Sequence, residues 1–145
     1  MRFSNYDLVD IFDRTDGDCH LCGRRLALAN YGCFGARGAW EVEHSNPRAT
    51  GGTNRRNNLY PACISCNRSK RDGSTRAHRA RYGRTAAPYG RAKRETLRQR
   101  NATISATVVG YAAHKAGLSP FQTVLVALIG GYAGHEIEPD PQRPR

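Results

Sequence analysis

The chain has 145 residues, which suits one domain or one small domain with an appendage. Its 23 basic and 12 acidic side chains give a formal net charge of +11, which favours a polyanionic partner, most often nucleic acid, over a role in solubility alone. No stretch approaches the roughly 18 apolar residues of a membrane span, and the N-terminus lacks the apolar segment of a secretory signal. We therefore expect a cytoplasmic protein, bacterial or phage-encoded. Apolar residues form 39% of the chain and cluster, which excludes disorder throughout.

Most of the positive charge lies in the middle of the sequence. Residues 1–72 have a net charge of +3, residues 73–101 have nine basic side chains and one acidic, and residues 102–145 are neutral overall. Composition therefore predicts a core (1–72), a basic nucleic-acid-binding segment (73–101), a helical region (102–137) and a tail (138–145) whose composition is typical of disorder.

The first expected element is a helix near the N-terminus. Ser4 or Asn5 can cap it, apolar residues follow at helical spacing as far as Phe12, and Asp16-Gly17 marks its end. We expect this helix to pack on the cysteine-rich turn that follows. Residues 24–39 are rich in Gly and Ala and form either an extension that reaches nucleic acid or an ordinary insertion.

Four of the five cysteines form two Cys-x-x-Cys pairs, Cys19/Cys22 and Cys63/Cys66, with 40 residues between the pairs. Two such pairs can complete a closed tetrahedral zinc site. The alternatives are disulfides or redox-active pairs. The absence of a secretory signal argues against disulfides. Cys33 is left over. We expect a free thiol there, because the four paired cysteines already occupy all four coordination positions of a tetrahedral zinc ion.

Between the cysteine pairs, residues 40–44 alternate in polarity and predict a short strand that ends at Glu43-His44. A loop containing Pro47 and Gly51-Gly52 must then bend back, and Asn58-Leu59 begins a return segment. Beyond Cys66, Asn67 and Lys70 would share one face of a helix.

This grouping provides the parts that phosphodiester hydrolysis needs. His44 can act as a general base, because imidazole titrates near neutrality. Glu43 and Asn67 offer oxygen ligands of the kind that Mg²⁺ accepts. Asn58 can fix the loop that presents His44. Each residue alone also has an ordinary structural explanation, and it is their joint spacing that favours a site.

The segment resembles the HNH endonucleases, the ββα-metal class with a structural zinc. The residues that carry this resemblance are Glu43-His44, Pro47, Gly51-Gly52, Asn58-Leu59, Cys63-x-x-Cys66, Asn67 and Lys70. The resemblance covers roughly residues 4–73. It implies an α+β fold, a small zinc-stabilised ββα-metal or treble-clef-like core followed by the basic segment and a helical hairpin.

The resemblance also implies roles for individual residues. His44 would be the general base and Asn58 the loop-orienting asparagine. Glu43 and Asn67 would bind a catalytic Mg²⁺ or Mn²⁺, and the four paired cysteines a structural Zn²⁺. The chain departs from the family pattern at Glu43, where Asp is commoner, and at Asn67, which replaces His and favours a hard, oxygen-ligated cation.

The basic residues after the second cysteine pair are expected to grip a nucleic-acid backbone, with a solvated linker as the alternative reading. Tyr82 and Tyr89 lie among them and could stack on bases or sugars. The spacing of the basic residues is irregular until about Arg91, after which we expect a helix. The candidate contacts are Arg68, Lys70, Arg71, Arg76, Arg79, Arg81, Arg84, Arg91, Lys93 and Arg94.

The C-terminal third predicts a helical hairpin. One helix covers about residues 104–115 and ends at Gly117, and a second begins at Ser119-Pro120, where a serine cap, a proline in the first turn and a glutamine follow the usual pattern. The hairpin could pack on the core, on a second copy in a homodimer, or on a partner protein. Its apolar run is too short to span a bilayer.

These observations favour a zinc-stabilised, divalent-metal-dependent endonuclease that cuts DNA and nicks one strand as a monomer. The alternatives are a nuclease that acts on RNA and a non-catalytic zinc-knuckle module for DNA binding or assembly. His44 and Asn67 discriminate between these classes, because a pure binding module needs neither.

Overall fold

A computed structural model describes residues 3–137 of the chain. The tail expected at residues 138–145 lies outside the described residues. The chain divides between Arg91 and Ala92 into two compact units, an N-terminal unit of mixed α and β structure and a C-terminal helical unit. The expected α+β fold class is confirmed.

The N-terminal unit begins with α1 (Asn5–Asp13), which is capped by Ser4. The Ser4 hydroxyl accepts a hydrogen bond from the amide of Asp7 at 3.2 Å, and the Asp7 carboxylate accepts one from the amide of Ser4 at 3.1 Å. This capping box fixes the start of the helix and aims Ile11 and Phe12 into the core.

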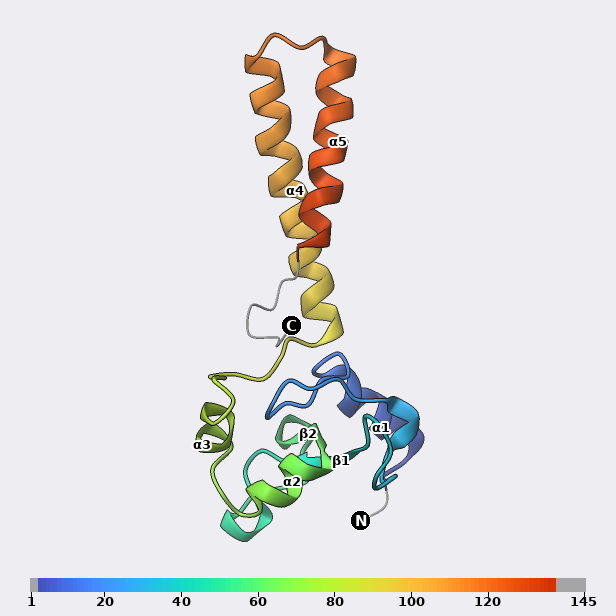
Figure 1. Ribbon diagram of the computed structural model, residues 1–145, viewed down its shortest axis with the longest axis vertical. Helices are drawn as coiled ribbons and strands as arrows, with labels where there is room; N and C mark the ends of the chain where they lie inside the picture. The colour runs from blue at the N-terminus through green and yellow to red at the C-terminus, as the bar shows by residue number, and fades with distance from the viewer. Residues whose placement is uncertain (1–2, 138–145) are drawn as a thin grey trace. The chain divides into compact units, whose positions relative to one another are not determined.

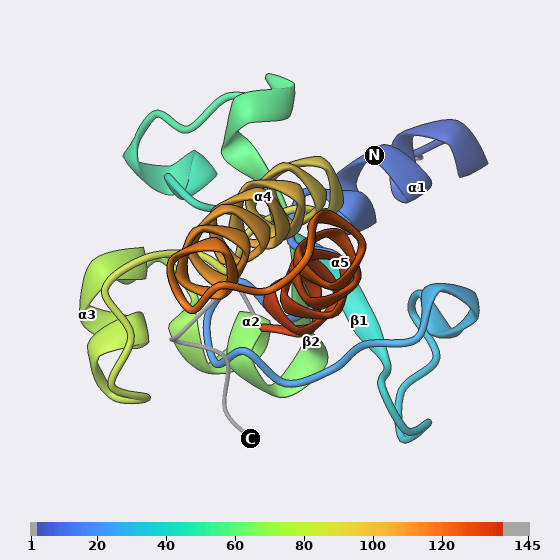
Figure 2. The ribbon, with the colours of Figure 1, turned by 90° about the horizontal axis from the view of Figure 1, so that it is seen from above.

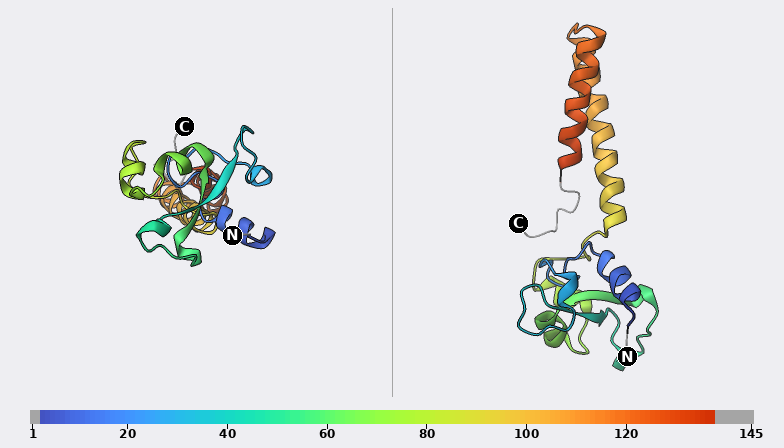
Figure 3. Two further views of the ribbon diagram at one scale, coloured as in Figure 1. Left: turned by 90° about the horizontal axis from the view of Figure 1, so that it is seen from below. Right: turned by 90° about the vertical axis from the view of Figure 1, so that its right-hand side faces the viewer.

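A two-stranded antiparallel sheet carries the centre of the unit. Strand β1 (Trp40–His44) pairs with β2 (Leu59–Cys63), so that His44 lies opposite Leu59 and Trp40 opposite Cys63. The helix α2 (Ile64–Lys70) follows β2 directly and packs against both strands (Figure 3). This order is the ββα arrangement that the resemblance implies.

The core of this unit lies between α1, the sheet and the cysteine-rich turn. Trp40 is fully buried, and its ring centroid lies 5.2 Å from that of Phe12. Leu21 and Leu59 complete this cluster together with three of the cysteines. The short helices η1 (Leu28–Asn30), η2 (Arg48–Thr50) and η3 (Arg56–Asn58) lie in the connecting loops.

The basic segment is more ordered than its composition predicts. It contains the short helix α3 (Thr75–Ala80), and the long helix α4 (Arg91–Lys115) begins near its end. The sequence favoured a helix only after about Arg91, and α4 begins at that residue and runs on through the helix expected at about residues 104–115. The basic residues after Arg91 are themselves good helix formers.

The C-terminal unit is the predicted helical hairpin. Helix α5 (Pro120–Glu136) begins with the predicted capping box, in which Ser119 and Gln122 bond each other's backbone amides. α4 and α5 lie side by side (Figures 1 and 2). None of the helices in residues 3–137 is both long and apolar enough to cross a membrane.

Candidate active site and zinc site

The two cysteine pairs converge on one point. Cys19 and Cys22 lie in the turn after α1, Cys63 ends β2, and Cys66 lies in α2, and the four sulfur atoms all lie within 4.8 Å of one another. A tetrahedral Zn²⁺ with bonds of about 2.3 Å separates its sulfurs by about 3.8 Å, and the Cys22 and Cys63 sulfurs are 3.9 Å apart. The four cysteines are free thiols, so the donor set and its spacing fit a structural zinc site.

The pKa values of the thiols in this cluster also indicate a site for a cation. Burial raises the pKa of the Cys19 thiol well above its usual value, whereas the neighbouring Cys19 thiol lowers the pKa of Cys22 to about 7. Four sulfurs this close cannot all ionise without a positive ion between them. Cys33 is exposed and stands outside the cluster, as expected.

His44 ends β1, and its side chain is held by a residue that the sequence patterns did not single out. Nε2 of His44 lies 2.8 Å from Oδ1 of Asn54 in the following loop. An amide oxygen only accepts hydrogen bonds, so Nε2 carries the proton and Nδ1 keeps its lone pair. Nδ1 is therefore the atom that can take a proton from water.

Asn58 ties the two ends of the loop that follows His44. Its Oδ1 accepts from the Asn46 amide at 2.7 Å, and its Nδ2 donates to the carbonyl groups of Asn46 at 3.0 Å and Thr53 at 2.8 Å. Gly52 supports the same bend, because a Cβ atom there would lie 1.8 Å from the Asn46 carbonyl oxygen. This geometry is that of a loop-orienting asparagine.

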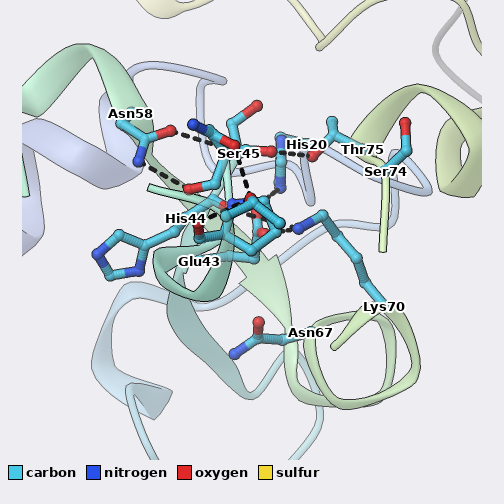
Figure 4. A network of polar contacts seen from close by, with 12 residues as sticks. His20, Glu43, His44, Ser45, Asn58, Asn67, Lys70, Ser74 and Thr75 are labelled. Atoms are coloured by element: carbon cyan, nitrogen blue, oxygen red, sulfur yellow. Dashed lines mark hydrogen bonds and ion pairs between the residues drawn. The ribbon is translucent and has the colours of Figure 1, made fainter. Parts of the chain in front are cut away.

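Glu43 lies next to His44 in the strand but points into the protein (Figure 4). One carboxylate oxygen lies 2.5 Å from Nε2 of His20, and the other lies 2.6 Å from Nζ of Lys70. Glu43, His20 and Lys70 are all buried. Burial opposes ionisation of Glu43, but its contacts with His20 and Lys70 outweigh that effect and lower the pKa of its carboxyl group.

His20 was not predicted as part of the site, although it lies inside the first cysteine pair. Its Nδ1 lies 2.9 Å from a guanidinium nitrogen of Arg79, which can only donate, so Nδ1 accepts and Nε2 carries the proton that faces Glu43. Its ring stacks on Tyr60 with centroids 4.9 Å apart. Burial lowers the pKa of His20, which keeps the ring neutral.

The structure does not bring Asn67 into contact with Glu43. Nδ2 of Asn67 donates instead to a carboxylate oxygen of Glu41 at 2.9 Å. Glu41 and Glu43 lie on the same face of β1, and α2 crosses this face with Asn67 beside Glu41 and Lys70 beside Glu43. Figure 4 shows Asn67 apart from the Glu43 network. Glu41 was missed, although its position two residues before Glu43 places it on the same strand face.

The structure changes the expected nucleic-acid surface at four positions. Lys70 is bound to Glu43, and the Arg79 side chain donates to the carbonyl oxygen and ring of His20. Arg84 and Arg94 are each 3% exposed. Lys70, Arg84 and Arg94 are buried, and Arg79 is half-buried with its guanidinium bound to His20, so we exclude these four residues from the surface that nucleic acid would meet.

The remaining predicted contacts are exposed, namely Arg68, Arg71, Arg76, Arg81, Arg91 and Lys93. Arg91 forms ion pairs with Asp13 at 2.9 Å and Asp16 at 3.6 Å, and Arg68 pairs with Glu41 at 3.3 Å. Arg48 and Arg55, which lie in the loop after His44, are also exposed and were missed by the sequence analysis.

A cavity of about 580 Å³ lies beside this loop. Polar groups from three segments line it. They include Ser45 and Asn46 from the first segment, Asn58 from the second, and Thr75 and Arg76 from the third. The Thr75 hydroxyl donates to the Ser45 carbonyl at 2.6 Å and so joins the start of α3 to the strand end that carries His44. Figure 4 shows Asn58, Ser45 and Thr75 grouped in this region.

Residues 19–73 match the family model described as HNH endonuclease. The matched segment contains both cysteine pairs, His44, Asn58 and Asn67. Neither the curated proteins nor the solved structures yield a significant match to the chain.

Proposed function

We propose that this chain, whose residues 19–73 match the HNH endonuclease family model, hydrolyses phosphodiester bonds in DNA with His44 as the general base. The observation that carries this proposal is the state of His44. Its ring is fixed through Nε2 by Asn54, its Nδ1 is left to accept a proton, and the loop beside it is clamped by Asn58.

His44 would remove a proton from the water that attacks phosphorus. A positioned base of this kind contributes about 10²- to 10⁴-fold to a rate. The Asn54 contact serves this role in two ways, because it sets the tautomer of the ring and limits its rotation. Asn58 acts one step away, as a positioning residue for the loop.

Glu43 and Asn67 are the proposed ligands of a catalytic divalent cation. A carboxylate and an amide oxygen are donors that Mg²⁺ and Mn²⁺ accept. Nδ2 of Asn67 is engaged by Glu41, which leaves Oδ1 as the ligating atom. When bound, such a cation would offset the charge that develops on the scissile phosphate. His20 and Lys70 hold the Glu43 carboxylate in its ionised form, as a ligand requires.

The exposed arginines would bind the DNA backbone. Arg71, Arg76 and Arg81 lie after α2 and along α3, the helix whose first residue bonds the strand end at Ser45. Each phosphate that is neutralised adds to the salt dependence of binding. One active site cuts one strand, so a single copy is expected to nick a duplex.

A non-catalytic DNA-binding module is the second candidate, and one observation favours it. Both carboxylate oxygens of Glu43 are engaged by buried side chains, and Asn67 is turned to Glu41. In that case Glu43 would be a structural residue, and the exposed arginines and the zinc site would serve binding alone.

Incubation of the full chain with supercoiled plasmid separates these candidates. With Mg²⁺ or Mn²⁺ a nuclease converts supercoiled plasmid into the open circular form, and EDTA stops the conversion. Parallel reactions with single-stranded DNA and with RNA define the substrate. Retention of plasmid in a gel shift without any cutting, under every divalent metal, would support the binding module instead.

A further inference from the structure

The α4–α5 hairpin exposes many large apolar side chains. On α5 the exposed residues are Phe121, Val124, Leu125, Leu128, Ile129 and Tyr132, with exposed fractions from 49% to 78%. On α4 they form a narrower stripe of Ile104, Val108 and Tyr111. Monomeric proteins rarely leave so much contiguous apolar surface in water, which indicates that another surface covers it.

The large apolar residues lie on the solvent-exposed surface of the hairpin because small residues occupy the contact between α4 and α5. A Cβ atom at Gly130 would lie 2.8 Å from Val109, and one at Gly134 would lie 2.4 Å from the Ser105 hydroxyl. The two helices therefore meet mainly through glycine, alanine and serine, with Val109 packed against Gly130, at a distance that leaves no room for larger side chains at the two glycines. The apolar face of α5 contributes little to the packing of its own hairpin, which leaves it for another molecule.

A bilayer fits this face less well than a protein surface does. Gln99, Thr103 and Thr107 are exposed on α4, so the hairpin is not apolar on all sides. A helix pair surrounded by lipid would expose these polar groups to hydrocarbon. The broad apolar face of the hairpin lies on α5, whereas α4 carries these polar residues beside its narrower apolar stripe.

Charge permits a second copy of this chain as the occupant of this face. Two chains with a net charge of +11 each repel one another wherever their basic segments meet. Helix α5 has no acidic or basic residue from Pro120 to Gly134. This neutral face is a surface through which two such chains can associate without bringing like charges together.

Shape and area agree with self-association. A groove of about 570 Å³ runs between the helices, and its floor is formed by small residues such as Ala106, Ala127 and Gly131. Val124, Leu128 and Tyr132 stand at its α5 side as a ridge. The same face thus supplies both a ridge and a groove, as a two-fold interface requires.

A whole aromatic side chain has about 150–250 Å² of surface and an aliphatic one somewhat less, so the exposed fractions of the six α5 residues correspond to on the order of 700 Å². A stable interface takes roughly 800 Å² from each partner. We propose that this chain forms a homodimer in which the α5 faces of two copies pack together, with the ridge of each copy in the groove of the other.

The test is the mass of the full-length protein in solution, measured by light scattering after gel filtration across micromolar concentrations. The wild type should have twice the monomer mass of 16.0 kDa. Leu128→Glu and Val124→Glu place a charge on the interface and should yield monomers. Thr107→Glu adds the same charge to an exposed position of α4 outside the ridge and should remain dimeric.

Several results would overturn the proposal. One is a wild type that stays monomeric at every concentration, and another is a Leu128→Glu variant that stays dimeric. A third is wild-type protein that floats with phosphatidylcholine vesicles, since this would assign the face to a membrane. Circular dichroism controls for folding, because Leu128 is exposed in the single copy and its replacement should leave the helix content unchanged.

Discussion

The ammonium group of Lys70 lies 2.6 Å from a carboxylate oxygen of Glu43, and the two side chains are 1% and 3% exposed. The same ammonium donates to the carbonyl oxygen of His44 at 3.2 Å. Lys70 therefore joins α2 to the end of β1 at the residue that carries the proposed base. A residue that its sequence position suggested for DNA contact is instead part of the interior of the site.

Replacement of Lys70 by methionine is expected to destabilise the protein. It leaves the Glu43 carboxylate buried without its cation, and removal of one partner of a buried pair costs about 3–5 kcal/mol. Urea denaturation followed by fluorescence of Trp40 measures the free energy of unfolding. Arg71→Met removes a basic side chain at the next, exposed position and should change this free energy by less than about 0.5 kcal/mol. Equal stabilities of the two variants would show that the pair is not formed.

The zinc site should control the stability of the N-terminal unit. Cys63→Ser removes one of four sulfur ligands, and a small unit of this kind relies on its metal for folding. We expect the variant to lose bound zinc and cooperative unfolding, and a chelator to lower the melting temperature of the wild type. Cys33→Ser is the matched control, because Cys33 is exposed and outside the cluster. A preparation that retains its full melting temperature after zinc removal would refute the assignment.

Asn58→Ala should impair cutting more than it impairs folding. The substitution removes three hydrogen bonds that hold the loop beside His44, and unsatisfied backbone groups cost about 1–3 kcal/mol where they are buried. We expect slower plasmid nicking with unchanged zinc content. Asn57→Ala changes the neighbouring exposed asparagine and should nick at the wild-type rate. If both variants nick equally fast, the loop does not depend on Asn58.

Arg76 in α3 and Arg81 at its C-terminal cap are exposed and should set the salt dependence of DNA binding. Each phosphate contact contributes about 0.9 to the slope of log K against log salt. The double variant Arg76→Gln, Arg81→Gln is therefore expected to lower this slope by about 1.8 if both residues contact phosphates. The variant Arg24→Gln, Arg37→Gln removes the same charge from the 24–39 loop. If both double variants lower the slope of log K against log salt equally, DNA binding depends on the net charge of the chain and not on a defined surface at Arg76 and Arg81.

The sequence was most informative where the relevant interactions are local. The spacing of the cysteine pairs, the alternation over residues 40–44 and the capping pattern at Ser119 each act within a few residues, and each corresponds to a feature of the structure. The helical hairpin could be predicted for the same reason.

The burial of charged residues could not be predicted in this way. Lys70 and Arg79 resemble surface cations in a basic run, but Lys70 is buried and Arg79 is half-buried because α2 and α3 place them against Glu43 and His20. Asn54, ten positions after His44, reaches its ring because Asn58 sets the path of the loop between them. These contacts depend on how distant elements pack, for which the spacing of residue types holds no signal.

The central claim is that His44 is the base of a nuclease, and the most direct measurement compares plasmid nicking by the wild type and His44→Ala with Mg²⁺ or Mn²⁺ present. The variant is expected to bind the plasmid like the wild type and to nick about 10²- to 10⁴-fold more slowly. His114→Ala, at an exposed position of the hairpin, should nick normally. Equal nicking by His44→Ala and the wild type, or DNA binding without any nicking by the wild type, would contradict the account.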